Sequence, residues 1–188
     1  RVNMKKVCVI TEGQTDIDIL KRILPSKLAK EVEFVAGGGW SGAQSSAVTI
    51  LAKRQIPVAL VIDADGNDEQ TIHEKLDSSR WLLRQAAVNV DFEVFLAVPQ
   101  IEAIFFQDQP FLEEVTHREF TDLEWRLMKL QPGELFGNNT VEKRKLLKKI
   151  FDHLNQDSIK ALQAHPLIKS LIKFLSFALT ARQEKQAA

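Results

Sequence analysis

The sequence of 188 residues contains no tyrosine and only one cysteine, Cys8. A single cysteine excludes a disulfide or a cysteine-based zinc site within the chain, and it suits a reducing, cytoplasmic compartment. The lack of tyrosine excludes any reaction that needs a tyrosine nucleophile. No apolar run approaches the roughly 20 residues that span a bilayer, so we expect no membrane partner.

The formal net charge is zero, because 25 Lys and Arg residues balance 25 Asp and Glu residues. No global positive field therefore draws in nucleic acid. The charges are nevertheless distributed unevenly: residues 66–140 hold six basic and fourteen acidic side chains, whereas residues 141–188 hold ten and four. This pattern fits a metal region beside a phosphate-binding region, and it equally fits exposed helices that carry charge for solubility.

Short apolar, β-branched runs alternate with stretches of helical periodicity through the first hundred residues. The alternation predicts an α/β fold, with a doubly wound, mostly parallel four-stranded sheet and helices on both faces. Beyond it the pattern is helical, so we predict one domain at 1–106 and a helical extension packed on it at 107–188. The predicted strands are 5–10, 32–36, 57–62 and 92–98, and the main predicted helices are 15–24, 41–53, 69–87, 119–130, 140–154 and 165–182.

Acidic residues follow three of these predicted strands, at the point where each strand ends. Glu12 follows the first strand, and Asp63 and Asp65 follow the third. Glu102 comes shortly after the fourth strand, and Asp16 lies one helical turn beyond Glu12. Because the carboxyl ends of parallel strands meet at one edge of a sheet, we expect these carboxylates to converge. Carboxylate oxygens are the ligands that Mg²⁺ prefers, so the set predicts a Mg²⁺ (or Mn²⁺) site.

Several short motifs surround these acids. They read Val-Ile-Thr-Glu-Gly at 9–13, Gly-Gly-Gly at 37–39 and Val-Ile-Asp-Ala-Asp at 61–65. In addition, Glu-Gly-x-Thr-Asp occupies 12–16, and Pro-x-Ile-Glu occupies 99–102. In order and spacing the motifs resemble the TOPRIM domain, a fold shared by topoisomerases, bacterial primases, small ribonucleases and the OLD (overcoming lysogenization defect) family of nucleases. They are most similar to the OLD-type nucleases.

The resemblance implies a role for each acid. Glu12 would be the acid nearest the scissile phosphate, and Asp63 and Asp65 would hold Mg²⁺. Asp16 and Glu102 would complete a second metal position. The implied activity is that of a metal-dependent endonuclease, a hydrolase that cleaves nucleic-acid phosphodiesters, with DNA favoured over RNA.

OLD-type enzymes also use a basic residue further along the chain. Lys143, within the basic run 142–145, is our candidate for that catalytic role, and a solvated helix face is the alternative interpretation. No ATP-binding motif is visible, so a chain that needs ATP would act as a non-autonomous TOPRIM subunit with a separate ATPase, in phage defence or repair. The missing tyrosine excludes a complete topoisomerase, and a homo-oligomer is left open.

Other interpretations of the paired aspartates have to be weighed. Asp-Ala-Asp-Gly at 63–66 also resembles the first motif of haloacid-dehalogenase-type phosphatases, but that motif normally ends the first strand and precedes a threonine, where this chain has Asn67. An EF-hand loop would match four positions of 63–74, but Asp68 stands where that loop requires glycine. A polar loop end that caps the next helix is the structural alternative.

The glycine run at 37–39 lacks the spacing of a nucleotide-binding loop. We predict a tight turn that keeps the backbone close to the acidic edge. Trp40, directly after it, would either stack on a base or cover the core. The four histidines are scattered and show no metal-binding spacing.

Overall fold

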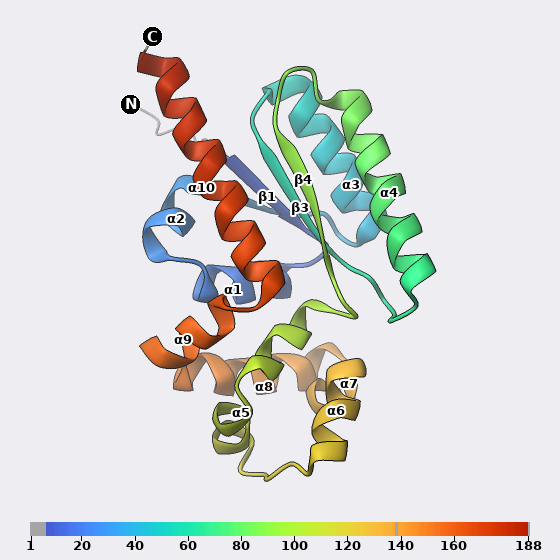
Figure 1. Cartoon of the computed structure of the whole chain (residues 1–188), viewed down its shortest axis with the longest axis vertical. Coiled ribbons are helices and arrows are strands. Elements are labelled where there is room, and N and C mark those ends of the chain that lie inside the picture. Colours follow the sequence, from blue (N-terminus) through green and yellow to red (C-terminus); the bar gives the residue numbers. More distant parts are fainter. Residues whose placement is uncertain (1–6, 138, 188) are drawn as a thin grey trace.

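The computed structural model describes residues 7–137 and 139–187, with residues 182–187 described by their backbone alone, and it contains a four-stranded sheet between layers of helices (Figure 1). The strand order is β2-β1-β3-β4, and every neighbouring pair is parallel. The α/β fold predicted from the sequence is confirmed. Residues 5 and 6 of the first predicted strand lie outside the described residues. The strands are β1 (Val7–Thr11), β2 (Val32–Ala36), β3 (Val58–Asp63) and β4 (Phe92–Ala97).

Helices cover both faces of the sheet (Figure 1). On one face α3 (Trp40–Thr49) packs on β1 and β3, and α4 (Glu69–Ala86) packs on β4. On the other face lie α1 (Gln14–Ile23) and α10 (Pro166–Ala187). Successive residues of β1 enter the two cores alternately, since Val9 belongs to one and Ile10 to the other. Burial on both faces explains why the strands are continuous apolar runs.

Two short elements interrupt the predicted pattern. The predicted helix 41–53 is α3 followed by a π-helical turn, η1 (Ile50–Arg54), which ends at Gln55 in a left-handed conformation. A further helix, α2 (Ser26–Glu31), lies between α1 and β2 and was not predicted. With six residues directly after Pro25, it is too short to show a helical period in the sequence.

The helical region lies beyond the carboxyl ends of the strands (Figure 1). An aromatic cluster holds it together: the Phe106 ring centroid lies 5.1 Å from that of Trp125 and 6.2 Å from that of Phe136. One of its helices, α9, was not predicted, although Asn155 caps it by accepting bonds from two backbone N–H groups. The elements are a 3₁₀ segment η2 (Ile101–Gln107), α5 (Gln109–Thr116), α6 (Asp122–Leu130), α7 (Gly133–Phe136), α8 (Thr140–His153) and α9 (Gln156–Gln163).

The last helix, α10, returns to the sheet and contacts β1, β3 and β4. A segment from the predicted extension therefore forms part of the layer that covers the sheet. The division at 106/107 stays a prediction. Among the described residues, no helix combines the length and the hydropathy needed to cross a bilayer.

Candidate functional site

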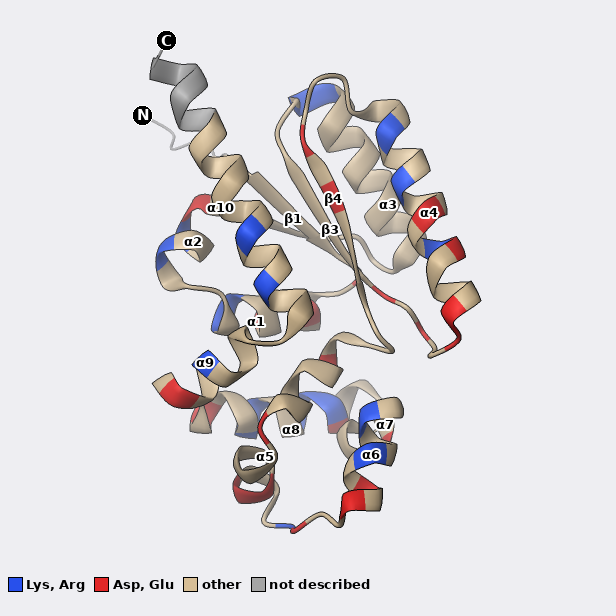
Figure 2. Cartoon of the chain, viewed as in Figure 1, with Lys and Arg blue, Asp and Glu red and all other residues tan. Residues whose placement is uncertain are grey.

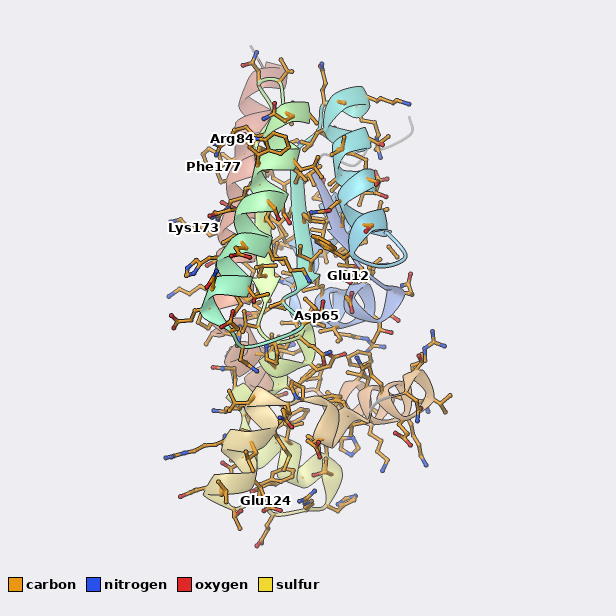
Figure 3. All side chains as sticks on the ribbon, turned by 90° about the vertical axis from the view of Figure 1, so that its right-hand side faces the viewer. Glu12, Asp65, Arg84, Glu124, Lys173 and Phe177 are labelled. Carbon is orange, nitrogen blue, oxygen red and sulfur yellow. The ribbon has the colours of Figure 1, made fainter. Side chains whose placement is uncertain are left out.

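Two hydrogen bonds connect three of the strand ends. Glu12 directly follows β1, and its Oε1 accepts a bond of 3.0 Å from the backbone N–H of Asp63, the last residue of β3. Asp63 Oδ1 in turn accepts a bond of 2.9 Å from the backbone N–H of Ile101, where η2 begins after β4. Figure 3 shows Glu12 and Asp65 at the end of the sheet that faces the helical region. The parallel topology has therefore brought these acids to one edge.

Asp16 stands in the first turn of α1, and its Oδ2 accepts a bond of 2.9 Å from the backbone N–H of Gly13. Burial raises the pKa of Asp16 to about 6, and the charges of Glu102 and Glu12 add to this effect. Burial likewise raises the pKa of Asp63 to about 8, and the charges of Asp16 and Glu102 add to it. The carboxylates are thus close enough to oppose one another's ionisation, and a positive charge among them would relieve that repulsion.

Glu102 is the most buried acid of the group, with 1% of its surface exposed. Its Oε1 lies 2.8 Å from Nζ of Lys143, which projects from α8. Its Oε2 is buried and has no hydrogen-bond partner within the described part of the chain. An unpartnered buried carboxylate oxygen is costly, so this atom needs a proton, a water molecule or a cation.

A cleft of about 380 Å³ opens between the strand ends and α8. Three of the acids, Glu12, Asp16 and Asp63, line it together with Lys143. Thr140, the first residue of α8, is also part of the wall. Sequence reasoning did not single out this threonine, because a residue at the start of a helix is more often explained by capping.

Asp65 lies apart from this cleft. It is exposed, its φ is 61°, and it is absent from the residues that line the cleft. Its Oδ2 lies 2.9 Å from Nζ of Lys75, on α4. Its predicted role as a metal ligand stays a prediction and requires the side chain to turn. Lys75 was missed because one lysine on a polar helix gives no signal in the sequence.

The glycine run forms the predicted tight turn beside Glu12. The backbone N–H groups of Gly38 and Gly39 both donate 2.9 Å bonds to the carbonyl oxygen of Glu12. At Gly37 a Cβ atom would lie 2.2 Å from the backbone nitrogen of Ala43, so only glycine fits there. Trp40 follows with 39% of its surface exposed, and therefore it does not simply cover the core.

The donor set suits a hard divalent cation, because it combines several carboxylates with an unpartnered oxygen of Glu102. Among the described residues, no three acidic, histidine or cysteine side chains are already arranged as a metal site. An ion would therefore have to draw the flexible side chains inward. Asp63, fixed by its bond from Ile101, is the point from which such a shell would be built.

No family model matches the chain, and no curated protein matches it either. Among solved structures, it is similar to the C-terminal region of the OLD protein of Xanthomonas campestris pv. campestris, with a TM-score of 0.53 and 10% sequence identity. The fold is similar to that of this OLD-protein region. The match covers 96% of this chain and 98% of the other, so it includes the helical region as well as the sheet. At this identity the similarity shows the fold alone.

Proposed function

We propose that the cleft between the strand ends and α8 is the active site of a Mg²⁺- or Mn²⁺-dependent nuclease of the TOPRIM type, which cleaves DNA phosphodiesters. One observation carries the proposal. Glu12, Asp16, Asp63 and Glu102 meet in one electrostatic cluster, where burial and mutual repulsion raise the pKa of Asp63 to about 8. Perturbed carboxyl groups that share a cleft are typical of sites that bind metal ions or transfer protons.

Each charged residue at the cleft would have a separate role in metal or substrate binding. Asp63 would hold the ion, because its carboxylate is fixed by the Ile101 N–H and lines the cleft. Glu12 and Asp16 would complete its shell, and Glu102 would serve a second position. When bound, the metal supplies charge stabilisation to the phosphate and lowers the pKa of an attacking water. Lys143 would exchange its pairing with Glu102 for the substrate phosphate.

The nucleic acid would follow α8. Figure 2 shows basic residues on this helix, which crosses below the strand ends. Arg144, Lys145 and Lys148 are exposed on the same helix as Lys143. A basic helix beside an acidic cleft allows the phosphate backbone to be held while the metal acts on one phosphodiester.

The similarity of the fold to an OLD-protein region also supports the proposal. The strand-end motifs resemble OLD-family nucleases, and the fold resembles a region of an OLD protein over nearly its whole length. The first resemblance concerns short motifs at the strand ends, and the second concerns the arrangement of the whole chain at a sequence identity of 10%. In a phage-defence or repair setting, ATP dependence would come from a separate ATPase subunit, and a homo-oligomer is compatible with the proposal.

The dehalogenase-type phosphatase is less well supported. Its motif normally ends the first strand of the sheet domain, whereas Asp63 here ends the third strand, β3. It also gives no role to Glu12, Asp16 and Glu102. The four-acid cluster therefore favours the nuclease.

Cleavage assays test the proposal. Supercoiled plasmid, single-stranded DNA and RNA are incubated with the chain in Mg²⁺, Mn²⁺ or EDTA, alone and with a candidate ATPase. We expect metal-dependent cleavage that falls at least about 100-fold in Asp63→Asn, since metal or charge stabilisation of this kind contributes several kcal/mol. Asp77→Asn, at an exposed position of α4, is the matched control and should cleave normally.

Equal cleavage by wild type and Asp63→Asn rejects the proposed site. Release of phosphate from simple phosphomonoesters that persists in Glu12→Ala would favour the phosphatase instead. Cleavage that appears only with the ATPase present would identify the chain as a non-autonomous subunit of the same nuclease.

A further inference from the structure

Lys75 contacts both aspartates at the end of β3, the backbone of Asp63 and the side chain of Asp65. Its Nζ donates a bond of 2.6 Å to the carbonyl oxygen of Asp63 and lies 2.9 Å from Oδ2 of Asp65. It also lies 5.2 Å from the ring centroid of Trp40. Only 13% of the Lys75 side chain is exposed, so its ammonium occupies a defined position. A fixed positive charge therefore stands directly beside the end of β3.

The backbone on either side of this contact is fixed as well. The N–H of Ala64 donates a bond of 2.8 Å to Ala97, and the N–H of Asp65 donates one of 2.9 Å to Pro99. These bonds continue the pairing of β3 with β4 beyond the last strand residue. The Asp65 side chain, in contrast, is 61% exposed and is held by the ammonium of Lys75. Apart from this ion pair, the described structure gives the Asp65 side chain no bond that would oppose its rotation.

We propose that Lys75 is an internal competitor for the divalent ion: its ammonium holds Asp65 away from the cleft, and the ion gains Asp65 as a ligand only when Lys75 releases it. The inference rests on the proposed function, since it takes the cleft to be the metal site. Lys75 is thus a positioning residue, which acts through Asp65. The ring of Trp40 lies next to the ammonium, so the fluorescence of Trp40 should report on the pairing of Lys75.

The competition should be modest. A pair in which one partner is largely exposed stabilises its geometry only weakly, and a divalent ion with several carboxylates can displace it. We expect removal of the ammonium to strengthen ion binding by about two- to fivefold, the range for a weak ion pair. If Lys75 were a simple brace for the loop, its removal would weaken ion binding instead.

Calorimetric titration with Mn²⁺ in the absence of nucleic acid tests the competition. The dissociation constant should fall about two- to fivefold in Lys75→Met and stay near the wild-type value in Lys75→Arg, which keeps the positive charge. Lys129→Met is the matched control, because Lys129 also faces a tryptophan ring, at 5.4 Å, but has no aspartate partner among the described residues. When Asp65→Asn is already present, adding Lys75→Met should change the binding free energy of Mn²⁺ by less than half as much as it does in the wild-type protein. Circular dichroism confirms that each variant is folded.

Fluorescence gives a second readout that needs no change at Lys75. The emission of Trp40, isolated as the difference between wild type and Trp40→Phe, should change when Mg²⁺ is added, because the ammonium beside the ring loses its aspartate partner. The same titration in Asp65→Asn should show less than half of that change.

The outcomes separate the inference from the proposed function. Wild type that binds Mn²⁺ as tightly as Lys75→Met, or more tightly, overturns the competitor role while leaving the metal site intact. Tighter binding in Lys75→Met supports the competitor role even if no cleavage is ever detected. If no variant binds Mn²⁺ at millimolar concentrations, the metal site fails, and the competitor role fails with it.

Discussion

The ammonium of Lys143 on α8 lies 2.8 Å from Oε1 of Glu102, a carboxylate with 1% of its surface exposed. This pair joins the helical region to the strand-end cleft, across the boundary predicted at 106/107. Because Glu102 Oε2 has no hydrogen-bond partner, Lys143 supplies the charge compensation that this buried group has in the described structure. The helical region therefore contributes Lys143 to the candidate site.

Lys143→Met should destabilise the metal-free protein by about 2 kcal/mol, because Glu102 would be left buried without its cation. Urea unfolding at pH 7 measures the change. The double variant Glu102→Gln/Lys143→Met should recover at least half of the lost free energy of unfolding, because position 102 no longer carries a buried negative charge. Additive losses in the double variant would show that the two side chains do not interact.

The glycine turn after β2 gives a matched pair of variants. Gly37→Ala should cost about 3 kcal/mol or more, because its Cβ would lie 2.2 Å from the backbone nitrogen of Ala43 and push the turn away from Glu12. Gly38→Ala should cost only about 1 kcal/mol, from its φ of 76°, since no described atom lies within 4 Å of the added Cβ. Thermal unfolding compares the two. Equal stability of the two variants would contradict the packing described at the turn.

The basic face of α8 predicts a salt-dependent interaction with DNA. Replacing Arg144, Lys145 and Lys148 together by alanine should reduce the slope of log binding constant against log salt by about 0.9 for each DNA phosphate that the protein no longer neutralises. Lys169→Ala with Lys173→Ala, at exposed positions on α10, is the control and should leave the slope unchanged. Fluorescence anisotropy with a labelled duplex measures it. A slope that the α8 triple variant leaves unchanged would place the DNA elsewhere.

Cys8 should be unreactive while the protein is folded. Burial raises the pKa of its thiol to about 12, so almost no thiolate exists at pH 8, and the side chain has no exposed surface. A thiol reagent such as 5,5′-dithiobis(2-nitrobenzoate) should therefore modify Cys8 only at the rate of unfolding. Modification within seconds in the absence of denaturant would show that β1 is not buried as described.

The fold could be predicted because its strands are strong local signals. Four apolar runs, three of them closely followed by acids or glycine and the fourth by Pro99, were enough to predict the parallel sheet and to bring Glu12 and Asp63 to one edge. The short helix at 26–31 and α9 were missed, because six or eight residues show too little of a helical period. The unpredicted return of α10 to the sheet depends on packing between distant segments, which a local pattern does not encode.

The site could be predicted only in part for a similar reason. Strand-end position predicted the neighbourhood of Glu12, Asp16, Asp63 and Glu102, because parallel topology fixes where the chain leaves each strand. It could not predict that Asp65 would face Lys75, since that depends on where α4 lies relative to the loop. Nor could it predict the buried pairing of Glu102, which depends on α8.

Crystals grown or soaked with Mn²⁺, with anomalous diffraction recorded, test the central claim most directly. The account predicts an anomalous peak in the cleft, about 2.0–2.3 Å from a carboxylate oxygen of Asp63 and from at least one of Glu12, Asp16 and Glu102. Clear density for these side chains with no peak among them at saturating Mn²⁺, or a peak bound only elsewhere on the protein, would contradict it.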